Sequence, residues 1–358
     1  MKVASFKKVI TCQVGDDLAG YGAGITSEAF HDDLYMRGIC MDDGTQKAVM
    51  VSFDLLGLDQ DEDETIRRIF REETGIPEEN VVLSCTHTHS GPHARKINRP
   101  NMFNERYVKE LYGWVREAAA ELAHAEFRET NIFFYGRHCP ENVNRRVVAI
   151  EDNTCRGLPE NKELLPIADG ICDDELGVLA FFDSAKRRLT DVLVNFAAHP
   201  LASHSPYIRA GHSISADYPG FLRDFVERES GIPCTFFNGA AGDMFPKEYE
   251  QGFGAAAKLG ETLGKAVLEC IADGTLKGVD TAVAQALPAG LNNPMNARVE
   301  AGETVPLNTS IPESSAFLGW FPESSDLALH LGVHPLKNCV ILVKGSRGIR
   351  MEKVLPVL

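Results

Sequence analysis

Histidines stand at two places where an apolar run of the sequence ends. His87 and His89 follow the run at residues 80–85, and His199 follows the run at residues 189–197. Ligand sites of open α/β sheets lie at the carboxyl ends of strands, and neutral imidazoles are donors that zinc accepts. The histidines therefore favour a metal or catalytic site. The alternatives are polar residues that cap the next helix and, for His199, a structural histidine.

The first of these histidine segments reads Thr-His-Thr-His-Ser-Gly-Pro. We expect the rings of His87 and His89 to point to opposite sides of an extended segment. One ring would then bind a metal ion while the other faces the substrate. The two histidines need not bind the same ion.

A third polar segment follows the apolar run at residues 234–238. It contains Asn238 and Asp243 among small residues, in the order Asn-Gly-Ala-Ala-Gly-Asp. Small residues allow backbone amides to approach a ligand closely. We interpret Asn238 and Asp243 as candidate substrate-binding residues, and a simple tight turn is the alternative.

Three further charged residues are candidates for a role at the same edge of the sheet. Asp54 ends an apolar run, and Asp217 opens a predicted helix, where it can also be an N-cap. Arg145 can polarise a carbonyl or hold an anion, and an ordinary surface charge is the alternative.

The elements that must position these residues alternate along the chain. Apolar runs predict strands, and apolar residues at helical spacing predict helices; the predicted strands are 47–58, 80–85, 176–183, 189–197 and 234–238, and the helices are 61–74, 105–124, 217–229 and 254–271. This order predicts an α/β protein with a layered mixed or parallel β-sheet core flanked by helices. Residues 1–279 would form the catalytic domain. Residues 280–358 would form an irregular β-rich part of it or a small appendage.

Composition and charge exclude several classes of partner. The net charge of −15 disfavours nucleic acid, and no apolar run is long enough to span a membrane. The first residues lack the apolar core of a secretory leader, and the odd number of cysteines, nine, favours reduced thiols. We therefore expect a cytoplasmic protein, and the sequence leaves a homo-oligomer open.

Seven motifs, in this order, resemble the catalytic domain of the neutral/alkaline non-lysosomal ceramidase family. They lie at residues 9–22, 34–44, 51–58, 86–92, 142–145, 198–200 together with 215–220, and 238–246. The resemblance implies a zinc-dependent amidase acting on a small-molecule amide, with water activated by the ion attacking the carbonyl. It also implies that His87 and His199 bind zinc, and that His89 and Arg145 contact the amide carbonyl.

The sequence departs from the family pattern at the remaining positions of the site. The resemblance implies a Glu and a Tyr that complete the zinc shell, but no Tyr follows Tyr249 and no Glu stands out as the ligand. Phe245 replaces a serine of the family, which excludes chemistry through that serine. No lipid-binding apolar segment is evident, so we expect a soluble substrate rather than long-chain ceramide.

Two other functions stay open at this stage. The chain can be a non-catalytic or impaired relative that kept the scaffold and lost part of the metal shell. It can also use the same histidines for a different metal-assisted reaction, such as ester or phosphoester hydrolysis.

Overall fold

The computed structural model describes residues 1–20, 24–96, 100–144, 147–149, 154–156, 172–185, 188–203, 212–248 and 251–275. Arg145 and the predicted C-terminal part at 280–358 lie outside the described residues. The predicted domain boundary therefore stays a prediction.

One eight-stranded sheet forms the centre of the molecule, in the order β13-β11-β10-β6-β1-β3-β4-β5. Its strands are β1 (Lys2–Val9), β3 (Tyr35–Asp42), β4 (Lys47–Phe53), β5 (Val81–Cys85), β6 (Arg128–His138), β10 (Glu175–Asp183), β11 (Arg188–Phe196) and β13 (Cys234–Asn238). The outermost pairs, β4–β5 and β11–β13, are parallel, and the others are antiparallel. The sheet is therefore mixed, as the sequence predicted.

The sheet is folded over on itself at the junction between β1 and β6. Only two residue pairs join these strands, whereas β1–β3 and β6–β10 are paired along their length. We call β1, β3, β4 and β5 the first half-sheet and β6, β10, β11 and β13 the second. Their facing surfaces pack through one apolar cluster, which is Val3, Ile39, Ile132, Phe181, Leu193 and Phe237. The outer strand β13 consequently contacts β5 and β4.

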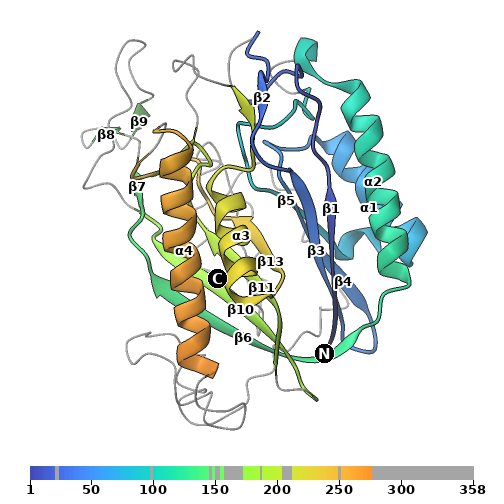
Figure 1. Cartoon of the computed structure of the whole chain (residues 1–358). Helices are drawn as coiled ribbons and strands as arrows, with labels where there is room; N and C mark the ends of the chain where they lie inside the picture. Colours follow the sequence, from blue (N-terminus) through green and yellow to red (C-terminus); the bar gives the residue numbers. More distant parts are fainter. Residues whose placement is uncertain are drawn as a thin grey trace.

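Helices cover the two outer faces of the folded sheet. Helices α1 (Gln60–Thr74) and α2 (Glu105–Ala123) pack on the first half-sheet, and α3 (Tyr218–Ser230) and α4 (Phe253–Thr275) pack on the second. Figure 1 shows the resulting order of layers: helices, half-sheet, half-sheet, helices. Strand β4 is buried on both faces because it lies between a helix layer and the other half-sheet. This explains why its sequence is almost continuously apolar.

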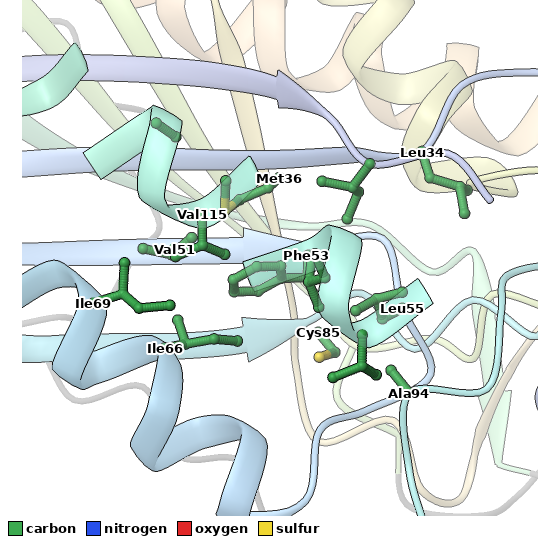
Figure 2. Packing of buried hydrophobic residues seen from close by; sticks show 14 of the residues in the cluster. Leu34, Met36, Val51, Phe53, Leu55, Ile66, Ile69, Cys85, Ala94 and Val115 are labelled. Carbon is green, nitrogen blue, oxygen red and sulfur yellow. The ribbon is translucent and has the colours of Figure 1, made fainter. Parts of the chain in front are cut away.

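The sequence of α1 contains its own start and stop signals. Three acidic residues lie in its first turn and Arg71 lies in its last, which matches the helix dipole. Gly75 ends the helix with a φ of 74°, a conformation that glycine adopts without strain. Ile66 and Ile69 then point from α1 toward Val51 and Phe53 of β4 (Figure 2).

Short elements complete the described part of the chain. They are β2 (Ala29–Phe30), β7 (Asn142–Asn144), β8 (Val147–Ala149), β9 (Thr154–Arg156), β12 (Ser213–Ile214), β14 (Met244–Pro246) and the 3-10 turns at Glu78–Asn80 and Pro100–Met102. Within the described ranges, no helix has the length and apolar character needed to cross a bilayer. Cys12, Cys40 and Cys234 are buried there as free thiols. Burial raises the pKa of Cys12, Cys40 and Cys234 to about 12, so these thiols are poor nucleophiles at neutral pH.

Candidate metal centre

His87 is the second residue of the loop that leaves the carboxyl end of β5. Its backbone N–H donates to the Leu55 carbonyl at 2.9 Å, and its ring Nδ1 lies 2.6 Å from the Leu56 carbonyl oxygen. A carbonyl oxygen can only accept, so Nδ1 carries the hydrogen. In the neutral ring, Nε2 then keeps its lone pair, which is the form that binds a metal ion.

The expectation that His87 and His89 face opposite sides is wrong. Residues two apart in an extended segment share a face, and the segment is not extended, because His87 has a φ of 72°. The centroids of the two rings lie 5.3 Å apart, at a steep angle of 74°. Both histidines of the motif therefore belong to one cluster.

His199 enters the same cluster from the second half-sheet. It follows the end of β11, and its N–H donates to the Met244 carbonyl at 2.9 Å. Its ring Nδ1 donates to the carbonyl oxygen of Ala241, again leaving Nε2 as the electron-pair donor. The ring stands edge-on to Phe245, with centroids 5.6 Å apart. Phe245, which replaces the serine of the family pattern, thus packs against a candidate ligand.

The three histidines could hold one metal ion. Each offers a ring nitrogen, and the three nitrogens lie within 4.8 Å of one another. The ring centroids of His87 and His199 are 4.9 Å apart, although the residues come from opposite half-sheets. Donors bound to one zinc ion at about 2.1 Å lie roughly 3.4 Å apart in tetrahedral geometry. Three imidazole nitrogens gathered in this way form a donor set of the type that zinc accepts.

His89 is held against the N-terminal segment. The Ala19 N–H donates to the Gly91 carbonyl at 2.8 Å, which brings Gly20 onto the imidazole of His89. A Cβ atom at Gly20 would lie 2.3 Å from Nδ1 of His89, and Gly20 has a φ of 88°. Only glycine satisfies both conditions without rearrangement. His87 and His89 are half-buried residues, and His199 is buried.

The two predicted substrate-binding residues lie at the end of β13 and on the turn that follows it. Asn238 is buried, and its side-chain amide donates to the Thr86 carbonyl at 2.8 Å, which ties β13 to the His87 loop. Asp243 is half-buried and accepts a hydrogen bond from the Asn144 side chain at 3.2 Å. Contact of either residue with a substrate stays a prediction, as does the role of Arg145.

Sequence reasoning missed the groups that orient the histidines. The carbonyls of Leu56 and Ala241 fix the rings, but every residue carries a carbonyl, so composition and spacing give no signal for them. The contact of Gly20 with His89 had a weak signal in the glycines at 20, 22 and 24.

Comparisons with known proteins agree with this fold and with the family expected from the motifs. No family model matches the chain. The neutral ceramidase of Pseudomonas aeruginosa is 30% identical over 179 residues, which cover 47% of this chain and 24% of that protein. The chain thus spans about a quarter of the length of this curated relative.

Solved structures share the fold over a larger part of the chain. The crystal structure of neutral ceramidase from Pseudomonas aeruginosa matches with a TM-score of 0.61 at 20% identity, covering 75% of this chain and 44% of that one. A ceramidase complexed with C2 matches with a TM-score of 0.62 at 21% identity, covering 75% and 43%. The sequence match confirms the resemblance to neutral ceramidases that the motifs indicated, and the solved structures show that the fold is shared.

Proposed function

We propose that the protein is a zinc-dependent hydrolase of linear amide bonds, with zinc bound by His87 and His199. The observation that carries this proposal is the gathering of three histidine nitrogens within 4.8 Å at the carboxyl ends of strands from both half-sheets. The similarity to a protein named neutral ceramidase supports the reaction class.

The residues of the cluster would have different roles in such a reaction. A bound zinc ion supplies a Lewis acid that polarises a carbonyl and lowers the pKa of water to about 7. The hydrogen bonds from Nδ1 of His87 and His199 keep both rings aimed at one point. His89 and Arg145 are proposed to donate to the carbonyl oxygen as it gains negative charge, a contribution of about 3 kcal/mol per donor.

A second candidate role for His89 is that of a third metal ligand. Its nitrogen belongs to the same group of three as those of His87 and His199, so His89 could be a third metal ligand. Catalytic zinc sites commonly use three protein ligands and leave one position open.

The substrate is proposed to be a small soluble amide rather than long-chain ceramide. A panel of N-acyl amides with short and long acyl chains tests this, with matched esters and phosphoesters included. We expect hydrolysis of the short amides, and its loss on treatment with a zinc chelator. Chelator-sensitive hydrolysis of the esters or phosphoesters alone would replace the amidase by another metal-assisted hydrolase.

The variant His87→Ala tests the metal site itself. The purified protein is expected to contain about one zinc ion per chain, and His87→Ala is expected to lose both the zinc and the hydrolysis. His124→Ala is the matched control, because His124 is an exposed histidine at the end of α2. A wild-type protein that binds no zinc and hydrolyses nothing would instead be the impaired scaffold.

A further inference from the structure

Residues 215–218 lie between the two loops that carry the histidines. On one side, the hydroxyl of Thr88 donates to the Ser215 carbonyl at 2.8 Å. The Ser215 N–H donates to the Ser90 carbonyl at 2.9 Å. Thr88 and Ser90 are the immediate neighbours of His89, so the backbone of Ser215 holds the first loop on both sides of this histidine.

The same short segment holds the second loop through its other end. The carboxylate of Asp217 accepts from the N–H groups of Ala202, at 3.2 Å, and Ser203, at 2.9 Å, and also from the Ser203 hydroxyl. The Tyr218 hydroxyl donates to the Ala198 carbonyl at 2.9 Å. These contacts fall just before and a few residues after His199. The segment thus links the two histidine loops directly.

The backbone of Asp217 is strained in a way that helix capping does not require. Its φ of 57° and ψ of −157° lie in a region that is almost restricted to glycine. An N-cap residue normally has an extended backbone and accepts from the second or third residue of the helix. The Asp217 carboxylate accepts from Tyr218, the first residue of the helix, and its remaining hydrogen bonds come from the His199 loop. A strained backbone of this kind persists only where several surrounding contacts hold it in place. Such residues are concentrated at functional sites.

The carboxylate of Asp32 also holds residues 215–218 in place. Asp32 accepts from the Ser215 hydroxyl and from the Ala216 N–H at 2.8 Å. The Ser215 hydroxyl oxygen in turn accepts from the Asp217 N–H at 3.0 Å. The position of Asp217 is therefore set by groups that lie outside both histidine loops. A residue that fixes the distance between the two loops must itself be held in this way.

We propose that Asp217 is a positioning residue that sets the separation of His199 from His87, and thereby the zinc affinity of the site. This inference rests on the proposed zinc site. Asp217 is fully buried, so it acts through the His199 loop and not on a substrate. Groups of this kind around metal ligands typically change metal affinity by about 10- to 100-fold when they are removed.

Asp217→Ala and Asp217→Gly test the proposal, with zinc affinity measured by competition with a chelator and thermal unfolding measured without metal. Both variants are expected to bind zinc about 10- to 100-fold more weakly. Glycine adopts the observed backbone angles without strain, so the glycine variant is expected to unfold at a higher temperature than the alanine variant, yet to bind zinc no better. Asn104→Ala is the control, because Asn104 caps α2 through Tyr107; it should lower the unfolding temperature and leave zinc affinity unchanged.

Crystal structures of metal-free wild-type protein and Asp217→Gly separate this inference from the zinc proposal. The ring centroids of His87 and His199, 4.9 Å apart in the wild type, are expected to move apart in the variant. Unchanged zinc affinity in both variants, or an unchanged ring separation, would overturn the role of Asp217. A wild-type protein that binds no zinc would overturn the proposed function, and the ring separation would still decide the role of Asp217.

Discussion

His87 combines a strained backbone with two hydrogen bonds to consecutive carbonyls. Its φ of 72° is rare for a residue with a side chain and costs about 1–3 kcal/mol. The conformation lets the backbone N–H bind Leu55 while the ring binds Leu56. Strain at a candidate ligand whose ring is fixed in this way is consistent with a site shaped for binding rather than for stability.

Replacing His89 separates its two possible roles. We expect His89→Ala to retain zinc affinity within about two-fold and to lower kcat/KM on an amide substrate about 100-fold, the loss typical of one donor to a developing oxyanion. Zinc affinity and steady-state kinetics on the same preparation make the comparison. A fall in zinc affinity of ten-fold or more would make His89 a metal ligand instead.

The residue types of the candidate site could be predicted from the sequence, but their arrangement could not. Histidines at the ends of two apolar runs identified His87, His89 and His199, and all three lie in one cluster. The side to which His89 points was predicted wrongly, because the sequence does not reveal the positive φ of His87. Asp217 was correctly interpreted as a possible N-cap, but its bonds to the His199 loop depend on a contact distant in sequence.

At the scale of elements, a buried ion pair joins strand β4 to helix α3. Arg223 of α3 donates to both carboxylate oxygens of Asp54, at 2.8 and 2.6 Å, and Asp54 also accepts from the Tyr35 N–H at 2.8 Å. Both side chains are fully buried. Asp54 directly precedes the residues whose carbonyls orient His87, so the pair fixes α3 beside the candidate metal centre.

Neutralising one partner of this pair is expected to be strongly destabilising. Asp54→Asn leaves the guanidinium of Arg223 without its counter-charge in a dry environment, which costs about 3–5 kcal/mol of unfolding free energy. The double variant Asp54→Leu/Arg223→Leu is expected to lose less. Urea unfolding of both variants and the wild type measures this order, and an equal or larger loss in the double variant would argue against the account of the pair.

A second ion pair joins strand β3 to helix α3 and predicts a pH dependence. Arg37 donates to Glu227 and to the Cys234 carbonyl, which lies 2.7 Å away. Burial raises the pKa of Glu227, but the Arg37 guanidinium, the Cys234 N–H and Lys7 together outweigh burial and hold this pKa below its ordinary value of 4.5. The pair therefore stabilises the fold above the unfolded-state pKa, and this stability is lost as pH falls through the folded-state pKa.

Glu227→Gln removes this pH-dependent contribution. Between pH 5 and pH 3 we expect the wild type to lose more unfolding free energy than the variant, because only the wild type must protonate a carboxylate bound to Arg37. Urea titrations at several pH values across this range provide the measurement. Parallel pH profiles for the two proteins would show that the pair contributes nothing to acid sensitivity.

Several elements were predicted closely, but strands β1, β3 and β6 were not predicted, and neither was the order of the strands in the sheet. Strand β13 and the residues of α1, α2 and α3 agree with the predicted ranges to within one or two residues. The predicted strand at 47–58 ends early, at Phe53, because the chain turns away there to bring the Leu55 and Leu56 carbonyls to His87. Periodicity predicts where an element lies along the chain, but not which strand pairs with which, since pairing depends on contacts distant in sequence.

At the scale of the whole molecule, the folded sheet brings the two histidine loops together. His87 follows β5, an outer strand of the first half-sheet, and His199 follows β11, next to the outer strand β13 of the second. Ser52 of β4 donates to the Phe236 carbonyl of β13, which links the half-sheets close to these strand ends. An ion bound by both histidines would therefore cross-link the two halves.

Anomalous scattering at the zinc absorption edge, from crystals grown with zinc, tests this cross-link most directly. The account predicts one strong peak within about 2.1 Å of a ring nitrogen of His87 and of a ring nitrogen of His199. A peak bound by only one of the two histidines, or no peak near either at saturating zinc, would contradict it.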